Sequence, residues 1–450
     1  MSKFDILFYM KCISTRNSAI QVDFAQAIRD CMPNDGGLFI PEDFEDLRRW
    51  LLYTNEKTSF TSIAGTLTSA FLKDEFSPII CETIAYNAFK NFEPQIKKID
   101  ERLYALELFH TPTGSHKDFG ISFLINVLET TLTMTGEKAV FLDATVGELG
   151  SSLAKMLRGK KNLKAVLLYP TLPKRKIRGL LPSDFVWNGG NILPLEIDGM
   201  EEDCHKIVRE LFSDRDFVKK TSLTAANTAN IGRLLPQSFF YPFAFSRLKK
   251  NVKGDIFYAV EPGNYSNLVA GLYSWKLSLP LKGLICPTTK ELKLDMTGKC
   301  IVMDGMVDFK NREKSDPASP SNLERLEEIF DANSLMLRNF IFPAEISEIE
   351  RTQAAQELFK KYGIFADKAT AGAFAAAQKR SEIKNDDDAT IVLVFRDHPA
   401  LSTGYISHTV GEEPTFPDEI KQAFEKVNLG KPKIKTAREV KEKMKEYGIF

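Results

Sequence analysis

Lys117 is the residue of this sequence with the clearest potential for covalent chemistry. It ends a small-residue, turn-forming segment, Leu108-Phe-His-Thr-Pro-Thr-Gly-Ser-His-Lys117, and precedes apolar residues at helical spacing over positions 119–128. The positive N-terminal end of a helix dipole disfavours an ammonium ion. An amine kept neutral in this way can attack an aldehyde and form a Schiff base. The same pattern also fits an ordinary surface lysine beside a turn.

Two glycine-containing turns offer a second kind of chemistry, the binding of anions. They read Asp143-Ala-Thr145-Val-Gly147-Glu148-Leu-Gly150-Ser151 and Gly263-Asn264-Tyr265-Ser266-Asn267. Each turn follows a predicted strand and precedes a predicted helix, where free backbone N–H groups can bind phosphate or carboxylate. A tight turn that binds nothing has the same pattern. A dinucleotide site is disfavoured because neither turn has the full G-x-G-x-x-G and no suitably placed acidic ribose partner stands out.

Short apolar runs predict the strands that position these turns. The runs lie at residues 139–143, 165–170, 255–260, 283–286 and 390–395, and turn residues bound each of them. Such runs are typical of strands that are buried on both faces of a parallel sheet. Helical spacing at 24–29, 119–128, 151–157 and 268–273 places helices around them. The sequence therefore predicts an α/β protein with βαβ units, whose ligands bind at the carboxyl ends of the strands.

The composition disfavours several other classes of protein. Lys and Arg total 60, as do Asp and Glu, so the basic excess of a nucleic-acid-binding protein is absent. No run reaches the ~18–20 apolar residues that a membrane span requires, and the first residues make a poor signal peptide. Six widely spaced cysteines and five histidines fit neither a disulfide framework nor a metal site. We expect a cytoplasmic protein without a metal and without a nucleic-acid or membrane partner.

The order of the motifs along the chain resembles threonine synthase, a pyridoxal-phosphate enzyme family of fold type II, the tryptophan synthase β class. The family motif L-F-H-G-P-T-x-x-F-K-D-F matches residues 108–119 and places Lys117 at the Schiff-base lysine. Residues 227–237 match the family's N-S-I-N-x-x-R-L-L-x-Q. Further segments match at 13–16, 35–41, 189–199 and 320–325, so the resemblance extends from about residue 10 to residue 399.

This resemblance implies a fold and a reaction. The fold would have open, twisted, mostly parallel sheets with helices on both faces, plus a largely helical N-terminal region. The reaction would convert O-phosphohomoserine and water to L-threonine and phosphate, through a Schiff base of Lys117 with pyridoxal 5'-phosphate. The expected units are a threonine-synthase-like region at 1–95, an α/β unit with the lysine and substrate loop at 96–245, and a second α/β unit at 246–450. The last unit would carry the phosphate-binding loop and a C-terminal helical tail, and the protein would be a monomer or a homodimer.

The resemblance also implies the residues of the site. Lys117 would be catalytic and would bind the cofactor, and no residue would bind a metal. The other cofactor-binding residues would be Gly263, Asn264, Tyr265, Ser266 and Asn267. The substrate, a small phosphorylated amino acid, would be bound by Thr145, Gly147, Glu148, Gly150, Ser151, Asn227 and Asn230.

Several positions depart from the family pattern. Val146 and Leu149 stand where the family loop A-T-S-G-D-T-G-S has hydroxyl residues, Ser266 replaces a glycine, and His116 replaces a phenylalanine. Arg396 stands where the family's T-A-H-P has a threonine that faces the pyridine nitrogen. An arginine that faced this nitrogen would keep it unprotonated, whereas one that points away would leave the role to another group. These departures keep two alternatives open: a phospho-lyase acting on a related γ-phosphorylated amino acid, and a non-catalytic relative of the fold.

Overall fold

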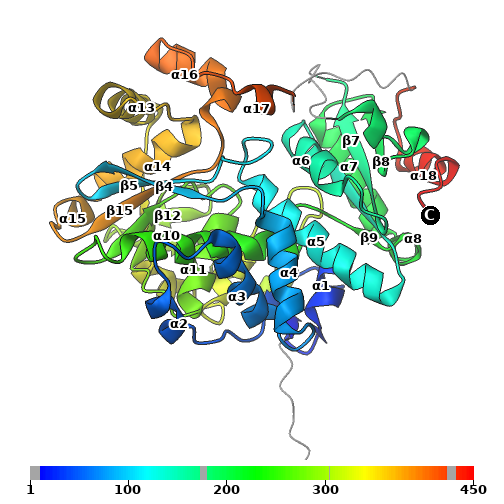
Figure 1. The fold of residues 1–450 in the computed structure, drawn as a ribbon, viewed down its shortest axis with the longest axis horizontal. Helices are drawn as coiled ribbons and strands as arrows, with labels where there is room; N and C mark the ends of the chain where they lie inside the picture. The colour runs from blue at the N-terminus through cyan, green and yellow to red at the C-terminus, as the bar shows by residue number, and fades with distance from the viewer. Residues whose placement is uncertain (1–10, 173–179, 304, 423–431) are drawn as a thin grey trace, which may run out of the picture.

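A computed structural model describes residues 11–172, 180–303, 305–422 and 432–450 of the chain. A four-stranded sheet, on the right in Figure 1, carries the first glycine turn. Its strands are β6 (Ala139–Ala144), β7 (Leu163–Pro170), β8 (Ile192–Ile197) and β9 (Leu223–Thr224). Their order is β8-β7-β6-β9, and each neighbouring pair is parallel.

The two faces of this sheet belong to different hydrophobic cores. Phe141 and Leu167 pack with the helices α5 (Lys117–Thr135) and α6 (Glu148–Leu157). Leu142 and Leu168 point the other way and pack with α7 (Glu201–Ser213). Successive side chains of a strand alternate between faces, so continuously apolar strands need a helix layer on each side. This arrangement confirms the expected α/β fold with helices on both faces.

A six-stranded sheet, on the left in Figure 1, carries the second glycine turn. Its order is β14-β11-β10-β15-β5-β4, with only the β4–β5 pair antiparallel. The strands are β4 (Gln95–Asp100), β5 (Leu103–Glu107), β10 (Ile256–Ala259), β11 (Gly283–Pro287), β14 (Ile341–Ala344) and β15 (Thr390–Phe395). Because β10 and β15 are parallel, with Ala259 opposite Leu393, their carboxyl ends meet at one edge.

The N-terminal region is mostly helical, as expected, and packs on the helix that begins with the lysine. It contains α1 (Phe24–Asp30), α2 (Arg48–Tyr53), α3 (Phe60–Leu72) and α4 (Pro78–Phe89), with the short antiparallel strands β1 (Cys12–Ser14), β2 (Gln21–Val22) and β3 (Phe39–Pro41). The ring of Phe60 lies 5.0 Å from that of Phe89 and 5.4 Å from that of Phe119 on α5. These buried rings fix α5 against α3 and α4, since edge-to-face aromatic pairs add to the free energy of burial.

The remaining elements surround the two sheets. The helices are α8 (Arg215–Thr221), α9 (Ile231–Leu234), α10 (Phe240–Leu248), α11 (Ser266–Lys276), α12 (Leu323–Glu328), α13 (Glu348–Tyr362), α14 (Lys368–Lys379), α15 (Ser381–Lys384), α16 (Thr403–Val410), α17 (Asp418–Gln422) and α18 (Ala437–Glu446). Short 3-10 helices are η1 (Pro182–Asp184), η2 (Val186–Asn188), η3 (Leu235–Phe239), η4 (Phe309–Asn311), η5 (Ser334–Asn339) and η6 (Pro399–Ser402), and β12 (Leu292–Leu294) pairs with β13 (Cys300–Val302).

The C-terminal helix α18 packs on the four-stranded sheet, at the right in Figure 1. Val440 and Met444 are buried there, and Ile434 forms a bridge with Ile197 of β8. The strands β4 and β5, in contrast, belong to the six-stranded sheet. Both sheets therefore contain segments from distant parts of the chain, and the division at residues 95 and 245 stays a prediction.

None of the helices in the described part of the chain is long and apolar enough to cross a membrane. The cytoplasmic location stays a prediction, as does the choice between a monomer and a homodimer.

A close approach of α5 and α9 leads to a prediction about stability. A Cβ atom on Gly120 would lie 2.5 Å from the backbone oxygen of Arg233 and would also collide with its guanidinium. We expect Gly120→Ala to lower the free energy of unfolding by about 1–3 kcal/mol, because forced repacking outweighs the better helix propensity of alanine. Urea denaturation of both proteins measures the change. Gly404→Ala, in the first turn of α16 with no atom within 4 Å of the added Cβ, is the control and should change it by less than about 1 kcal/mol. Equal effects of the two substitutions would contradict the close approach.

Candidate functional site

Lys117 is the first residue of α5, and a buried carboxylate fixes its backbone. Its amine forms an ion pair with the carboxylate of Glu148, which comes from the first glycine turn. The next residue, Asp118, is fully buried and accepts hydrogen bonds from the N–H (2.8 Å) and hydroxyl (2.9 Å) of Thr113 and from the hydroxyl of Ser152 (2.5 Å). Burial raises the pKa of Asp118 while these hydrogen bonds lower it. The sequence motif thus forms a rigid loop that presents the lysine.

Asp397 joins this loop to the end of β15. Its carboxylate accepts a hydrogen bond from the hydroxyl of Ser115 (2.5 Å) and lies 3.3 Å from Nδ1 of His116. The backbone N–H of His116 also donates to the carbonyl of Arg396, at 2.8 Å. Burial favours a higher pKa for Asp397, but the hydrogen bond from His116 and the positive charges of Lys117 and Arg396 hold the pKa well below its usual value. The group is therefore a fixed negative charge beside the lysine loop at neutral pH.

The first glycine turn is held by its own hydroxyl groups. Oγ1 of Thr145 accepts hydrogen bonds from the N–H groups of Gly147 (3.0 Å) and Gly150 (3.1 Å), and the hydroxyl of Ser151 donates to the carbonyl of Gly147 (2.8 Å). Gly147 has a φ of 138°, and a side chain on Gly150 would collide with the hydroxyl of Tyr169. Both glycines are thus required by the turn. The turn directs Glu148, its central acidic residue, toward Lys117.

Asn227 fastens this turn to the neighbouring segments. Its Nδ2 donates to Oδ1 of Asp143 (3.1 Å) and to the carbonyl of Pro317 (2.7 Å). Asp143, near the end of β6, also accepts a hydrogen bond from the N–H of Ala226 (2.8 Å). Burial raises the pKa of Asp143 to about 7, although these hydrogen bonds and the charge of Arg233 lower it.

Asn230, predicted from the same motif, directs both ends of its amide into the protein. It is completely buried, its Nδ2 donates to the carbonyl of Ile28 (2.7 Å), and its Oδ1 accepts from the N–H of Gly232 (3.0 Å). This is an N-cap of α9 that also attaches α1. The geometry supports a part in shaping the site.

The second glycine turn has a backbone that favours glycine at its first residue and is strained at its third. Gly263 has a φ of 52° and Tyr265 a φ of 69°. The hydroxyl of Tyr265 leaves the turn and bonds Thr289 (2.8 Å) and Glu291 (2.5 Å), so its side chain anchors the turn from outside. Ser266 begins α11 and places the N-terminal end of this helix at the turn.

Two asparagines of this turn attach it to the protein. Asn264 donates to the hydroxyl of Thr228 (2.7 Å) and to the carbonyl of Pro320 (3.1 Å). Asn267 donates to the carbonyl of Glu261 (3.2 Å). The first of these contacts connects the second glycine turn to the motif that contains Asn227 and Asn230.

The predicted residues therefore lie on segments that contact one another in a ring. The first turn contacts Lys117 through Glu148, the lysine loop contacts Asp397, and the second turn lies against Arg396, the residue before it. The second turn then bonds Thr228, next to Asn227, which returns to the first turn through Asp143. The ring joins the carboxyl ends of β6, β10 and β15, where ligands of open α/β sheets bind.

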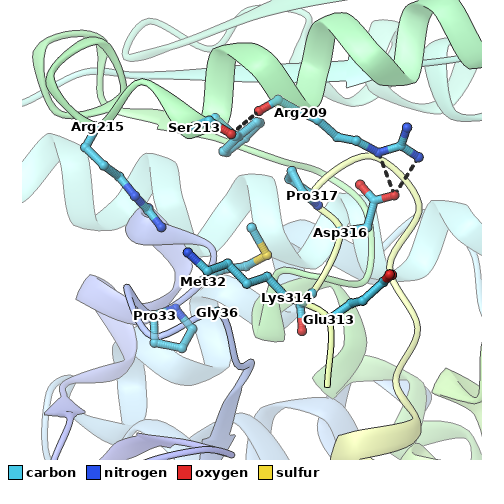
Figure 2. A pocket seen from close by; sticks show the side chains of 12 residues that line it. Met32, Pro33, Gly36, Arg209, Ser213, Arg215, Glu313, Lys314, Asp316 and Pro317 are labelled. Carbon is cyan, nitrogen blue, oxygen red and sulfur yellow. Dashed lines mark hydrogen bonds and ion pairs between the residues drawn. The ribbon is translucent and has the colours of Figure 1, made fainter. Parts of the chain in front are cut away.

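A separate cavity of about 460 Å³ lies beside this ring (Figure 2). It is bounded by residues 32–36, by the end of α7 with the start of α8, and by residues 313–317. Arg209 holds Asp316 with two hydrogen bonds of 2.9 and 2.7 Å across this cavity. None of the predicted site residues lines it, but Pro317 connects its wall to Asn227.

The relatives of this sequence show to which family the chain belongs. Residues 11–89 match a family model described as the threonine synthase N terminus. The threonine synthase of Escherichia coli strain K12 is 30% identical over 417 residues, which make up 91% of this chain and 94% of that protein. The chain belongs to the threonine synthase family. The resemblance seen in the motifs is thereby confirmed.

Solved structures of threonine synthases have the same fold. The crystal structure of the Escherichia coli enzyme covers 97% of this chain with a TM-score of 0.76 at 25% identity, and the match spans 100% of that enzyme. A pyridoxal-phosphate-bound threonine synthase from Brucella melitensis covers 97% of this chain and 99% of its own, with a TM-score of 0.78 at 22% identity. The fold expected for this threonine synthase family member is confirmed.

Sequence reasoning missed several residues that build the site. Thr228 accepts hydrogen bonds from Asn264 and from Asn322 (3.0 Å), and Asp397 fixes the lysine loop. Thr228 stands between the two asparagines of a recognised motif, and Asp397 stands in the altered motif at 396–399. The motifs around Thr228 and Asp397 could have indicated a role for both residues. Their hydrogen-bond partners, however, are distant in sequence.

The raised pKa of Asp143 leads to a prediction about pH. An aspartate with a pKa of about 7 in the folded state, against about 3.8 when exposed, binds more protons folded than unfolded between these values. Stability contributed by this group is therefore present at low pH and is lost as the pH rises from about 4 to 7. We expect Asp143→Asn to flatten the pH profile of the unfolding free energy by up to about 1.4 kcal/mol per pH unit in this window. Urea denaturation at several pH values measures it, and parallel profiles for the two proteins would contradict the assignment.

Proposed function

We propose that this member of the threonine synthase family converts O-phosphohomoserine and water to L-threonine and phosphate, with pyridoxal 5'-phosphate as cofactor. The observation that carries the proposal is the ion pair of Lys117 with Glu148, which brings the amine of α5 to the first glycine turn. A family relation that extends over nearly the whole chain supports it. The substrate of this proposal is a small phosphorylated amino acid.

The residues present fit the cofactor. Lys117 supplies an amine for an aldehyde. The second glycine turn supplies the N-terminal end of α11, which favours an anionic phosphate. Arg396 places a guanidinium beside Gly263 of this turn. Its Nε is buried and has no hydrogen-bond partner in the described part of the chain, so its positive charge is available to an anion. When bound there, pyridoxal phosphate would supply the electron sink that carbanion chemistry requires.

Lys117 and Glu148 would handle protons. Nζ of Lys117 and Oε2 of Glu148 are in direct contact, so a proton can be exchanged between the amine and the carboxylate. The amine must lose a proton before it reacts with an aldehyde, and it must gain and lose protons as general acid and base at the substrate carbons. Glu148 is thus proposed to hold and orient Nζ in addition to its place in the substrate loop.

The first glycine turn and the asparagine motif would bind the substrate. We propose that the N–H groups of Glu148 and Leu149, at the start of α6, receive the substrate carboxylate. Thr145 holds the turn in the conformation that exposes these groups. Asn227 lines the adjoining segment, and Asn230 shapes it from beneath.

A phospho-lyase is the second candidate, and the composition of the first turn favours it. Val146 and Leu149 lack the hydroxyl groups of the family loop, while the hydroxyls of Thr145 and Ser151 already bond the backbone of the turn. Fewer side-chain donors would then select a different γ-phosphorylated substrate. Such an enzyme would release a keto acid, ammonia and phosphate.

Product analysis of the purified protein separates these functions. The protein is mixed with pyridoxal phosphate and O-phosphohomoserine, and threonine, keto acid and phosphate are measured while the visible absorbance is recorded. Threonine and phosphate in equal amounts support the proposed function. A keto acid with ammonia supports the phospho-lyase, and an absorbance band without any product contradicts turnover of this substrate.

Replacing the lysine tests its assignment. We expect Lys117→Ala to abolish the imine absorbance band and to reduce phosphate release to background, because no other amine is placed at the first turn in the described structure. Lys138→Ala is the control, since this exposed lysine lies beyond the far end of α5, and it should keep both signals. Borohydride reduction followed by peptide mapping should locate the cofactor on Lys117. Turnover retained by Lys117→Ala would contradict the assignment of Lys117 as the catalytic lysine.

A further inference from the structure

Arg396 lies directly beside the second glycine turn. It follows β15, and the turn follows β10, its parallel neighbour, so both segments leave the sheet at the same edge. Nη1 of Arg396 is 3.3 Å from the position that a Cβ on Gly263 would take. The guanidinium therefore lies against the backbone of the turn, which only a glycine leaves open.

The guanidinium of Arg396 has no protein partner among the residues that the structure describes. Across the described parts of the chain, no hydrogen bond or ion pair reaches it, and its Nε is closed off from solvent. The surrounding carboxylates have other partners: Asp397 accepts from Ser115, Asp367 caps α14 at the N–H of Thr370, and Glu261 lies 3.7 Å from Arg351. They act on Arg396 only through longer-range charge interactions. A partly buried cation left without a partner is costly, and an anion that binds beside it removes this cost.

The second glycine turn offers further donors. The helix α11 has 11 residues, and its first N–H groups lack partners within the helix, so its N-terminal end is positive. The hydroxyl of Ser266, at its first position, has no hydrogen-bond partner among the described residues and can donate. A guanidinium, a hydroxyl and a helix N-terminus together match the charge and the several oxygens of a phosphate monoester.

We propose that Arg396 binds a phosphate monoester at the second glycine turn, and that this phosphate is the one of the cofactor. The inference rests on the proposed function for the identity of the cofactor. In this proposal Arg396 contacts the phosphate of the cofactor and does not face the pyridine nitrogen. Arg396 and Ser266, two departures from the family pattern, would then both donate hydrogen bonds to this phosphate. In the family pattern, a threonine stands at the position of Arg396 and a glycine at that of Ser266.

The contact predicts selectivity between two forms of the cofactor. Pyridoxal lacks the phosphate but keeps the aldehyde and the ring. Absorbance titration of the full-length, cofactor-free protein gives a Kd for each aldehyde. We expect Arg396→Met to weaken pyridoxal phosphate about 10- to 100-fold and pyridoxal less than about 3-fold, since only the former loses a charge-assisted hydrogen bond. Arg438→Met, at a side chain that is 88% exposed, is the matched control and should change neither Kd.

The wild-type chain provides a check that needs no substitution. Inorganic phosphate should compete with pyridoxal phosphate, because both fill the anion site. Inorganic phosphate should not compete with pyridoxal, because pyridoxal leaves the anion site empty. Phosphate bound at that site should instead tighten the binding of pyridoxal. Arg396→Lys, which keeps the charge, should retain part of both effects.

Each remaining outcome overturns the inference. Equal weakening of both aldehydes by Arg396→Met, with a shifted absorbance maximum, places the arginine at the ring. A second such outcome is that Arg396→Met leaves the Kd for pyridoxal phosphate unchanged and weakens the binding of O-phosphohomoserine to the cofactor-loaded protein. That result would show that Arg396 binds the phosphate of the substrate. A wild-type protein that binds neither aldehyde contradicts the proposed function as well, whereas wild-type binding that ignores Arg396→Met contradicts only the role of the arginine.

Discussion

One fully buried arginine holds together the segments that surround the site. Arg325 donates to the carbonyl of Phe39 (2.9 Å), to the carbonyls of Thr228 (2.5 Å) and Ala229 (2.8 Å), and to Oδ1 of Asn322 (2.7 Å). These partners belong to the N-terminal region, the asparagine motif and the segment that contacts the second glycine turn. Burial lowers the pKa of Arg325 to about 10, so the group stays charged at neutral pH. A guanidinium suits this position because its fixed fork of donors can satisfy several carbonyls at once.

A second buried guanidinium, that of Arg233, lies against Gly120 of α5, the helix that begins at Lys117. Arg233 is 4% exposed, and within residues 11–172, 180–303, 305–422 and 432–450 its Nε and Nη1 have no hydrogen-bond partner. Burial lowers its pKa to about 10, while the negative charges of Asp118, Asp143 and Asp397 raise it. Its charge is therefore balanced through space by the carboxylates that fix the lysine loop and the first glycine turn. Gly120 leaves the room that this arrangement needs.

The altered motif at 396–399 contains two neighbouring departures from the family pattern. Asp397 fixes the loop that presents Lys117, and Arg396 places a positive charge at the second glycine turn. The two changes are neighbours at the end of one central strand, and their opposite charges lower the electrostatic cost of each other.

The sequence by itself determined the parts of this protein that local patterns encode. The buried strands at β6, β7, β10, β11 and β15, the helix that starts at Lys117 and the two glycine turns follow from apolar periodicity and from turn chemistry, which act between neighbours. The sequence also carried the family, because its motifs occur in order.

Only the tertiary structure decided which of these residues face one another. Asn230 and Tyr265 stand in motifs whose pattern suggested ligand contact, yet their side chains bond Ile28 and Glu291. The pairing of β5 with β15 and the bridge of Ile434, which precedes α18, to Ile197 of β8 likewise join distant segments. Contacts between residues that are far apart along the chain leave no periodic trace in a sequence, so only the packed structure brings Arg396 to Gly263 and Glu148 to Lys117.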